Sequence, residues 1–399
     1  MIAGTITDLG DIPPDALPPR HHDGRLRILN VGLPILGLSS FSRALAEYAS
    51  TRHDVVMTRF ELVNTTWMKV LFRASPIPWS MDLQCSNMTR LWARRIRSAI
   101  DAGALDLGRF DAVVTCPQHH ARAFIDRRPR GRPFVISAHT DATATNATRD
   151  FGDSALTMGP QHRDERFVFP RCDVVTCMGW FAGRSARDDY GVDPARLMLI
   201  PPTTTEIGEG TWHGRDAALG RPARIAIAGN DWERKGGPEL LRWHQARWSE
   251  RAQLHVFGHG APVDPGARNV TWHGRVPRDR LIGELLPSMD IFVLPTKRDM
   301  SPWVVVEAAG AGVATVATRV GGLADEVVHG ETGYLCTPGN EDECIHAVET
   351  LLNDPERCLR MGRAAREFAR CNFTPSVVYG GLVDRLWGEY RKQAGPSAA

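Results

Sequence analysis

The sequence has no marked excess of charge of either sign and no long apolar run. Its 48 Lys and Arg residues against 46 Asp and Glu residues give a net charge of +2, so nothing favours a nucleic-acid-binding surface. No run of about 18 apolar residues occurs, and we expect no transmembrane segment. Residues 1–24 contain Pro and Asp but no apolar core, so we expect a loose N-terminal tail without a secretory signal peptide.

The cysteines are not spaced as a metal site or a disulfide framework. They are Cys85, Cys116, Cys172, Cys177, Cys336, Cys344, Cys358 and Cys371, and no C-x-x-C pair occurs among them. Cys116 and Cys177 lie in apolar runs, which is typical of small core residues. We therefore expect reduced thiols and a cytoplasmic protein. Internal repeats and low-complexity tracts are also missing.

Short apolar strands alternate with helical segments along the whole chain, a pattern typical of parallel α/β folds. A chain of 399 residues exceeds the size of about 250–300 residues at which single cores stop growing, so we expect two domains. The predicted strands are 26–31, 54–60, 112–116, 133–137, 173–177 and 197–200, then 223–228, 253–257, 269–272, 290–294, 313–317 and 334–336. Between the two sets, residues 201–222 have no periodicity and form the predicted hinge.

Two carboxylates, Asp299 and Glu307, lie eight residues apart in the second half of the chain. Asp299 is in a loop after the apolar strand 290–294, and Glu307 is in the helical run 304–311. This strand, helix and following strand form one βαβ unit, which places both acids near the carboxyl edge of a parallel sheet. Ionised carboxylates only accept hydrogen bonds, so the pair suits a hydroxyl-rich ligand such as a sugar or ribose.

This ordered set of motifs resembles the donor-binding half of the retaining glycosyltransferases of family 4, which have the GT-B fold. The resemblance rests on Asp299, seven residues, Glu307, then Gly321-Gly322 and the GETG run 330–333, and it extends over residues 26–392. It implies two Rossmann-like domains with parallel sheets facing each other across a cleft. Residues 25–201 would form the acceptor domain and residues 220–372 the donor domain. A C-terminal helix over 376–392 would cross back to the first domain.

In the donor domain, the resemblance implies a diphosphate clamp in the segment 229–237, GNDWERKGG. Lys235 matches the family lysine that grips the diphosphate, and it precedes a helix opened by Pro238. Asn230 stands where the family usually has an arginine. Arg234 is therefore a candidate substitute, although its side chain could equally point to solvent.

The other donor contacts are also implied by the resemblance. Glu307 would accept hydrogen bonds from ribose hydroxyls, and because its helix is apolar it needs a ligand or a buried partner. Asp299, where the family more often has glutamate, would contact the donor sugar together with Ser301 and the backbone N–H of Trp303. Pro302 removes a backbone N–H at this loop. Gly321 and Gly322 would contribute backbone N–H groups, and Arg275 and Val276 match the position that seats the base.

In the first domain, His139 follows the strand predicted at 133–137 and matches a family histidine that faces the reacting centre. Asp141 would orient it or bind the acceptor. Gly37 and Ser39, in the loop 32–41 after the first strand, would approach phosphate and acceptor. The segment 65–81 mixes aromatic and basic residues and would line the acceptor site, pack internally or touch a membrane at the inner face.

The resemblance implies transfer of a hexose from a nucleotide sugar, UDP- or GDP-linked, to a hydroxyl acceptor. Retention would follow from front-face attack, with the leaving phosphate deprotonating the acceptor, and no protein cofactor is implied. The chain contains no Asp-x-Asp motif, so we expect no metal site. The sugar, the base, the acceptor and the oligomeric state stay open.

Three alternatives remain beside this interpretation. Asn230, Asp299 and Pro302 depart from the family pattern, which keeps a non-catalytic or regulatory GT-B protein that only binds nucleotide sugar in consideration. A GT-B epimerase or phosphorylase is a further alternative, the latter requiring a pyridoxal lysine. A dinucleotide-dependent oxidoreductase is least favoured, because no G-x-G-x-x-G follows either opening strand.

Overall fold

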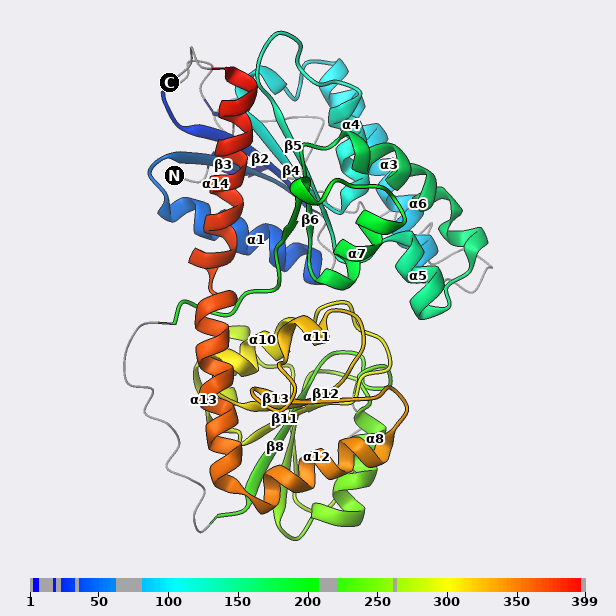
Figure 1. Ribbon diagram of the computed structural model, residues 1–399, viewed down its shortest axis with the longest axis vertical. Helices are drawn as coiled ribbons and strands as arrows, with labels where there is room; N and C mark the ends of the chain where they lie inside the picture. Colours follow the sequence, from blue (N-terminus) through cyan, green and yellow to red (C-terminus); the bar gives the residue numbers. More distant parts are fainter. Residues whose placement is uncertain are drawn as a thin grey trace. The chain divides into compact units, whose positions relative to one another are not determined.

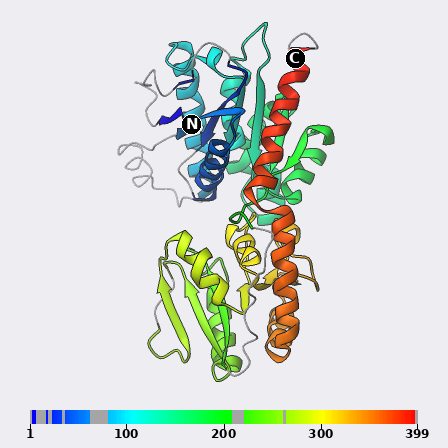
Figure 2. The ribbon, with the colours of Figure 1, turned by 90° about the vertical axis from the view of Figure 1, so that its left-hand side faces the viewer.

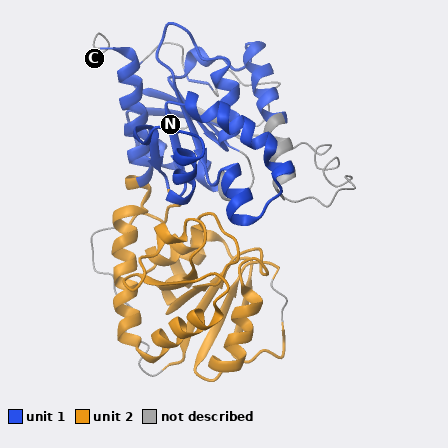
Figure 3. Cartoon of the chain, turned by 45° about the vertical axis from the view of Figure 1, so that its right-hand side comes forward, with its two compact units in different colours: residues 1–200, 378–399 blue, residues 201–377 orange. Residues whose placement is uncertain are grey.

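The computed structural model describes residues 3–6, 17–18, 23–32, 36–61, 81–207, 221–260 and 264–395. The chain divides into two compact units: unit 1 comprises Met1–Ile200 and Val378–Ala399, and unit 2 comprises Pro201–Val377 (Figure 3). Each unit contains one parallel sheet (Figure 1). In the described ranges, no helix combines the length and the apolar character needed to cross a bilayer.

The sheet of unit 1 has seven parallel strands in the order β1-β3-β2-β4-β5-β6-β7. They are β1 (Ala3–Ile6), β2 (Leu26–Gly32), β3 (Val55–Glu61), β4 (Ala112–Cys116), β5 (Val135–Thr140), β6 (Val174–Cys177) and β7 (Leu197–Leu199). The described helices of unit 1 are α1 (Leu36–Thr51), α3 (Met81–Asp101), α4 (Ala121–Ile125), α5 (Ala144–Phe151), α6 (Ala155–Val168) and α7 (Trp180–Asp188). Short 3-10 turns occupy Leu107–Arg109, Gln118–His120, Phe169–Arg171 and Pro194–Arg196.

Strand β1 corrects the expectation of a loose N-terminal tail. Ala3 pairs with Thr58 and Ile6 with Phe60 of β3, so this short segment forms an edge strand of the first sheet. Four residues are too few to show the alternation that identifies a strand in sequence. The strand β1 forms because its backbone pairs with β3. No local sequence pattern predicts that pairing.

The last helix, α14 (Pro375–Ala394), belongs to unit 1 from Val378 onward. Its Tyr379 is fully buried, and the ring lies 6.0 Å from that of Phe41 in α1. The predicted helix over 376–392 agrees with these bounds to within two residues.

The sheet of unit 2 has six parallel strands in the order β10-β9-β8-β11-β12-β13. They are β8 (Ala223–Ala228), β9 (Ala252–Phe257), β10 (Val270–Gly274), β11 (Ile291–Leu294), β12 (Ala314–Thr318) and β13 (Gly333–Cys336). The helices are α8 (Gly237–Trp243), α9 (Arg278–Arg280), α10 (Trp303–Gly310), α11 (Leu323–Glu326), α12 (Glu341–Asn353) and α13 (Pro355–Asn372). Helix α13 runs beside the sheet (Figure 2). The described part of unit 2 also contains two π-helical segments, His244–Trp248 and Leu281–Leu285, and the 3-10 turn Leu286–Ser288.

Both faces of the second sheet are apolar, and helices cover both. Ile291 and Val293 of β11 join one buried cluster with residues of α8, α12 and α13. Phe292 and Leu294 join another cluster with residues of α10 and α11. Because successive strand side chains point to opposite faces, an uninterrupted apolar strand must be covered on both sides. This packing fixes α10, and with it Glu307, against the sheet.

The predicted strands agree with the observed ones to within two residues at each end, with one exception. The strand predicted at 133–137 is β5, Val135–Thr140, and it ends three residues later than predicted. His139 is therefore inside a strand, where it pairs with Thr176 of β6. Cys116, Cys172, Cys177, Cys336, Cys344 and Cys358 are buried free thiols, and Cys371 is an exposed free thiol.

Candidate functional site

The predicted donor residues of unit 2 meet at one edge of its sheet. Strands β8, β11 and β12 are parallel neighbours, so the loops that follow them lie together at the carboxyl edge, where open α/β sheets bind ligands. These loops carry Asn230, Arg234 and Lys235 after β8, Asp299 and Ser301 after β11, and Gly321 and Gly322 after β12.

Two glycines place Lys235 at the end of β8. A Cβ on Gly229 would lie 3.0 Å from Cγ of Lys235, so the lysine stem crosses directly over this glycine. Gly236 has φ of +77°, and a Cβ there would lie 2.2 Å from the carbonyl oxygen of Pro295. Only glycine fits that turn. The turn opens α8 and leaves the Lys235 side chain 11% exposed.

Asp299 pairs with both cations of the predicted diphosphate loop, Lys235 and Arg234. Its Oδ2 accepts a hydrogen bond from Nζ of Lys235 and lies 3.3 Å from Nη1 of Arg234. Arg234 also donates to the carbonyl oxygen of Arg298 at 2.5 Å and to Asp231 at 2.9 Å, so its side chain is held in the loop. Asp299 and Asp231 thus pair with both cations of this loop, which holds Lys235 and Arg234 together beside the carboxyl edge of the sheet.

The buried Glu307 carboxylate is paired with Arg278, whose side chain is half exposed. Its Oε1 accepts a hydrogen bond from Nε of Arg278 at 2.6 Å, and the same guanidinium donates to the carbonyl oxygen of Thr203 at 3.2 Å. Burial raises the pKa of the Glu307 carboxyl above its usual range, while the charge and hydrogen bond of Arg278 oppose that rise. The Arg278 guanidinium also lies 5.6 Å from the centre of the Trp303 ring.

Arg278 was not predicted as a site residue. It follows β10, which two other strands separate from β11 in the sheet order. Helix α9 and the segment after it pack on the same face as α10, because Leu281 and Val305 share one apolar cluster. The only signal in the sequence was that Glu307, in an apolar helix, needs a ligand or a buried partner.

The turn Gly321-Gly322 packs directly on the Asp299 loop. A Cβ on Gly321, whose φ is +53°, would lie 2.0 Å from the carbonyl oxygen of Asp299. The backbone N–H of Gly322 donates to the carbonyl oxygen of Met300 at 2.5 Å. That N–H is therefore already used within the protein. Ser301 donates its hydroxyl to the buried Glu326, a residue that the sequence analysis did not single out.

Asn230, which stands where the family usually has an arginine, contacts a histidine in the loop after β9. Oδ1 of Asn230 lies 2.9 Å from Nδ1 of His259, which follows β9. The loop after β10 carries Arg275, which is exposed, and Val276, which packs on the apolar cluster beneath α10. These positions share the carboxyl edge with the other predicted residues.

In unit 1, His139 is a fully buried, neutral imidazole. Its ring stacks on Phe41 with centroids 4.0 Å apart and an interplanar angle of 6°. Nδ1 lies 3.0 Å from Oγ1 of Thr176, and burial lowers the pKa of His139 to about 3. Nε2 is buried and has no hydrogen-bond partner among the described residues. An imidazole in this setting can exchange hydrogen bonds but carries no charge at neutral pH.

Other predictions for unit 1 need correction or fall outside the described residues. No hydrogen bond joins Asp141 to His139 in the described ranges; Asp141 accepts from the backbone N–H of Ala142 at 2.9 Å. Gly37 and Ser39 lie in the first turn of α1, which begins at Leu36, earlier than predicted. Gly37 lowers local helix propensity and concealed that start. The segment 65–80 is outside the described residues.

A second buried acid lies near the carboxyl edge of the first sheet. Glu165 of α6 accepts a hydrogen bond from Gln118, which follows β4, at 2.8 Å, and from the backbone N–H of Ala144 at 2.9 Å. Burial raises the pKa of Glu165 to about 7. The burial of Glu165 and its contact with Gln118 could not be predicted from sequence, because both depend on how α6 packs against the loop after β4.

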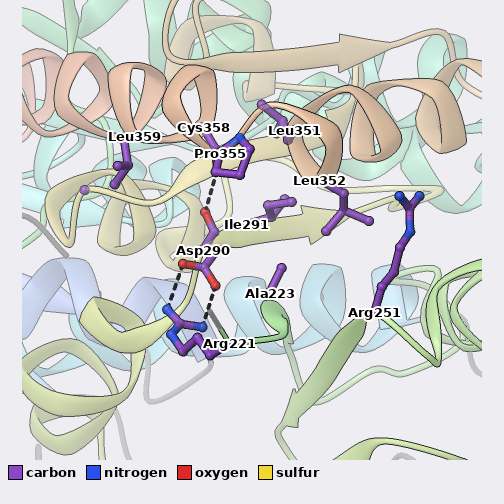
Figure 4. A pocket seen from close by; sticks show the side chains of 11 residues that line it. Arg221, Ala223, Arg251, Asp290, Ile291, Leu351, Leu352, Pro355, Cys358 and Leu359 are labelled. Carbon is purple, nitrogen blue, oxygen red and sulfur yellow. Dashed lines mark hydrogen bonds and ion pairs between the residues drawn. The ribbon is translucent and has the colours of Figure 1, made fainter. Parts of the chain in front are cut away.

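A cavity of about 140 Å³ in unit 2 lies at the other edge of the sheet (Figure 4). Ala223 and Ile291 begin β8 and β11, and Leu351 and Cys358 come from α12 and α13. An ion pair between Arg221 and Asp290 lines it. Because the cavity lies at the amino ends of the strands, it is separate from the loops that carry Lys235 and Asp299.

Two family models match the chain. The model described as "Glycosyltransferase Family 4" matches residues 37–204, and the model described as "Glycosyl transferases group 1" matches residues 266–368. The D-inositol 3-phosphate glycosyltransferase of Corynebacterium glutamicum (strain R) is 28% identical over 265 residues, covering 60% of this chain and 62% of that protein. The chain thus matches less than two thirds of that relative's length.

Two solved structures show the same fold. Sucrose-phosphate synthase from Thermosynechococcus elongatus has a TM-score of 0.66 at 16% identity. HepE from Anabaena, solved in complex with UDP-glucose, has a TM-score of 0.62 at 14% identity. Each likeness covers 91% of this chain and 100% of the other. The predicted GT-B fold class, with two Rossmann-like domains built on parallel sheets, is confirmed.

Proposed function

The chain belongs to the group 1 glycosyltransferases of family 4, and we propose that it is an enzyme that transfers a hexose from a nucleoside diphosphate sugar to a hydroxyl acceptor. The observation that carries this proposal is the contact between Lys235 and Asp299 at the carboxyl edge of the second sheet, with Glu307 in the helix α10 that follows the Asp299 loop. A diphosphate needs positive charge, and a ribose and a hexose need hydrogen-bond acceptors.

Relatives support the choice of donor. The curated relative with 28% identity is a glycosyltransferase that acts on inositol 3-phosphate, according to its name, and a solved relative holds UDP-glucose. We therefore propose a UDP- or GDP-hexose as donor for this chain. Lys235 and Arg234 would bind the diphosphate, with Asn230 and His259 nearby. The backbone around Arg275 and Val276 would seat the base.

Glu307 would hold the ribose through the carboxylate oxygen that Arg278 does not occupy. Asp299 would accept hydrogen bonds from donor-sugar hydroxyls once Lys235 turns towards the diphosphate. The N–H of Trp303 at the start of α10 would be a further donor. The backbone of Gly321 would contribute at the same loop, since the N–H of Gly322 is already bonded to Met300.

We propose that the reaction retains the anomeric configuration through front-face attack. The bond between the anomeric carbon and the phosphate oxygen breaks, and the bond to the acceptor oxygen forms on the same face. The acceptor proton passes to the leaving phosphate oxygen, and Lys235 stabilises the charge that grows there. We expect turnover to need no added metal, so an excess of EDTA should leave the rate unchanged.

The acceptor would bind to unit 1, which holds His139, Asp141, Gly37 and Ser39. If Thr176 uses its hydroxyl hydrogen on the carbonyl oxygen of Ala138, 3.4 Å away, then His139 donates through Nδ1. Its Nε2, which is buried and has no partner in the described part of the chain, is then a hydrogen-bond acceptor that a sugar hydroxyl would reach only if the side chains around it moved. The acceptor class itself is open to glycans, lipid-linked sugars and secondary metabolites.

The proposal is tested by incubating the protein with UDP- and GDP-hexoses and a panel of hydroxyl acceptors, and measuring release of the nucleoside diphosphate. We expect turnover with one base, lost in Lys235→Ala and in Glu307→Ala. Near-normal turnover in either variant would contradict the assignment. A thermal-shift series with UDP, GDP, ADP and dTDP identifies the base, because a ligand at a hundredfold over its Kd stabilises by about 2.7 kcal/mol.

A non-catalytic protein that only binds nucleotide sugar is the second candidate. It is favoured by Pro302, which occupies the N-cap position of α10 and offers no backbone N–H there. Nucleotide binding without turnover on the whole acceptor panel would support this candidate.

A further inference from the structure

We propose that Glu326 is a positioning residue for the donor sugar, acting through Ser301 to hold the loop that presents Asp299. This inference rests on the proposed function and adds a residue to its donor site. Glu326 is the last residue of α11, and it is 1% exposed.

The contacts of Glu326 lead directly to the Asp299 loop. Its Oε1 accepts the hydrogen bond from the Ser301 hydroxyl, and Ser301 is itself 6% exposed. Its Oε2 is buried and has no hydrogen-bond partner among the described residues. A buried carboxyl group that uses only half of its hydrogen-bonding capacity is unfavourable for packing alone. The hydrogen bond that Glu326 does accept comes from Ser301, in the loop that carries Asp299.

The backbone around this contact leaves the loop little freedom. Gly321 and Gly322 approach the carbonyl oxygens of Asp299 and Met300 so closely that a Cβ on either glycine would overlap them. The hydrogen bond between Ser301 and Glu326 fixes the third residue of the loop. The shape of 299–301 is therefore set by the turn after β12 and by α11 as well as by β11.

The direction in which the pKa of Glu326 is shifted fits this role. Burial raises the pKa of its carboxyl well above the usual range. The charges of Asp299 and Asp325 raise that pKa further, while the Ser301 hydrogen bond and the Lys235 charge lower it. In its protonated form Glu326 adds no negative charge beside Asp299. As the pH rises through the Glu326 pKa, a second carboxylate forms there and repels Asp299.

The role predicts a selective defect. Loss of the contact should disturb the part of the site that holds the hexose and leave the diphosphate and ribose contacts of Lys235 and Glu307 in place. The informative quantity is therefore the Kd of the nucleotide sugar divided by the Kd of the matching nucleoside diphosphate. A general loss of folding would weaken both ligands alike and would not move this ratio.

The experiment measures both Kd values by calorimetry for wild type, Glu326→Leu, Glu326→Gln and Ser301→Ala, with Asp325→Asn as the neighbouring control. We expect the ratio to rise about tenfold or more in Glu326→Leu and Ser301→Ala. It should stay within about threefold of wild type in Glu326→Gln, which can still accept from Ser301, and in Asp325→Asn. The double variant Ser301→Ala/Glu326→Leu should resemble the single variants.

A pH series supplies a second readout. In wild type the ratio should rise as the pH increases through the Glu326 pKa, whereas Glu326→Gln should lack that rise. An unchanged ratio in both Glu326→Leu and Ser301→Ala would overturn the inference alone. If Glu326→Leu does not fold, Ser301→Ala decides, because it removes only a hydroxyl. A wild type that binds neither ligand would overturn the proposed function, and this inference with it.

Discussion

Removing Arg278 should destabilise unit 2 because it takes away the cation beside a buried carboxylate. In Arg278→Gln, Glu307 keeps its place in the apolar helix α10 but loses the partner that lies 2.6 Å from its Oε1. The glutamine can still reach a hydrogen-bonding distance but carries no charge. The unfolding free energy should therefore fall, and it should fall in a pH-dependent way.

The magnitude follows from the burial of the two partners. Exposed ion pairs contribute about 0.2–1 kcal/mol, whereas removing one partner of a buried pair costs about 3–5 kcal/mol. The Glu307 side chain is 6% exposed and that of Arg278 is 51% exposed, so an intermediate loss of about 2 kcal/mol is expected. For a domain of this size, that loss lowers Tm by about 4–8 °C.

The pH dependence has a definite sign. The folded-state pKa of Glu307 already lies above the ordinary value of 4.5 because of burial, and loss of Arg278 raises it further. A carboxyl whose pKa is raised by folding loses stability as the pH rises through its folded pKa. The difference between wild type and Arg278→Gln should therefore be small near pH 4.5 and largest near pH 8.

The assay is urea unfolding of both proteins across this pH range, with Arg280→Gln as control. Arg280 pairs with Glu284, and both side chains are more than half exposed, so this variant should lose less than about 0.5 kcal/mol at any pH. Equal losses in the two variants, or a loss in Arg278→Gln that does not change with pH, would refute the reasoning.

Three further outcomes are expected. Lys235→Ala should lower the initial rate of nucleotide release about 100-fold or more, whereas Lys297→Ala, whose side chain is 58% exposed and paired with Glu239, should stay near wild type; equal rates would contradict the diphosphate role. Gly236→Ala should lose more than about 3 kcal/mol in urea unfolding, because it combines positive φ with the overlap at Pro295. Gly339→Ala, with φ of +82° and open space around it, should lose only about 1–2 kcal/mol. With its pKa at about 3, His139 stays neutral while the unfolded chain takes up a proton below about pH 6.5. Wild type should therefore lose stability as the pH falls from that value, and a slope that is unchanged in His139→Gln would contradict this account.

The positions of the site loops could be predicted from sequence because they depend on local patterns. Apolar strands, helices with small residues and glycine turns follow one another in the order of a parallel α/β sheet, and such a sheet brings its loops to one edge. The loop of Asp299 was found in this way, whereas the segment 229–237 was identified through the resemblance to family 4. The requirement that Glu307 have a partner was also visible, since its helix is apolar throughout.

The identities of the contacts could not be predicted. Arg278 and Glu307 come from segments on strands that are not neighbours, and Ser301 meets Glu326 only because the turn after β12 packs on the loop after β11. The pairing of Lys235 with Asp299 likewise depends on the adjacency of β8 and β11. Sequence also misplaced the end of β5, so the burial of His139 and its stacking on Phe41 were not foreseen.

A crystal structure of the protein with a UDP- or GDP-hexose tests the central claim most directly. The account predicts a diphosphate oxygen within hydrogen-bonding distance of the Lys235 ammonium, ribose hydroxyls on the Glu307 carboxylate and the hexose against Asp299. A nucleotide bound elsewhere, with the contact between Lys235 and Asp299 intact, would contradict it.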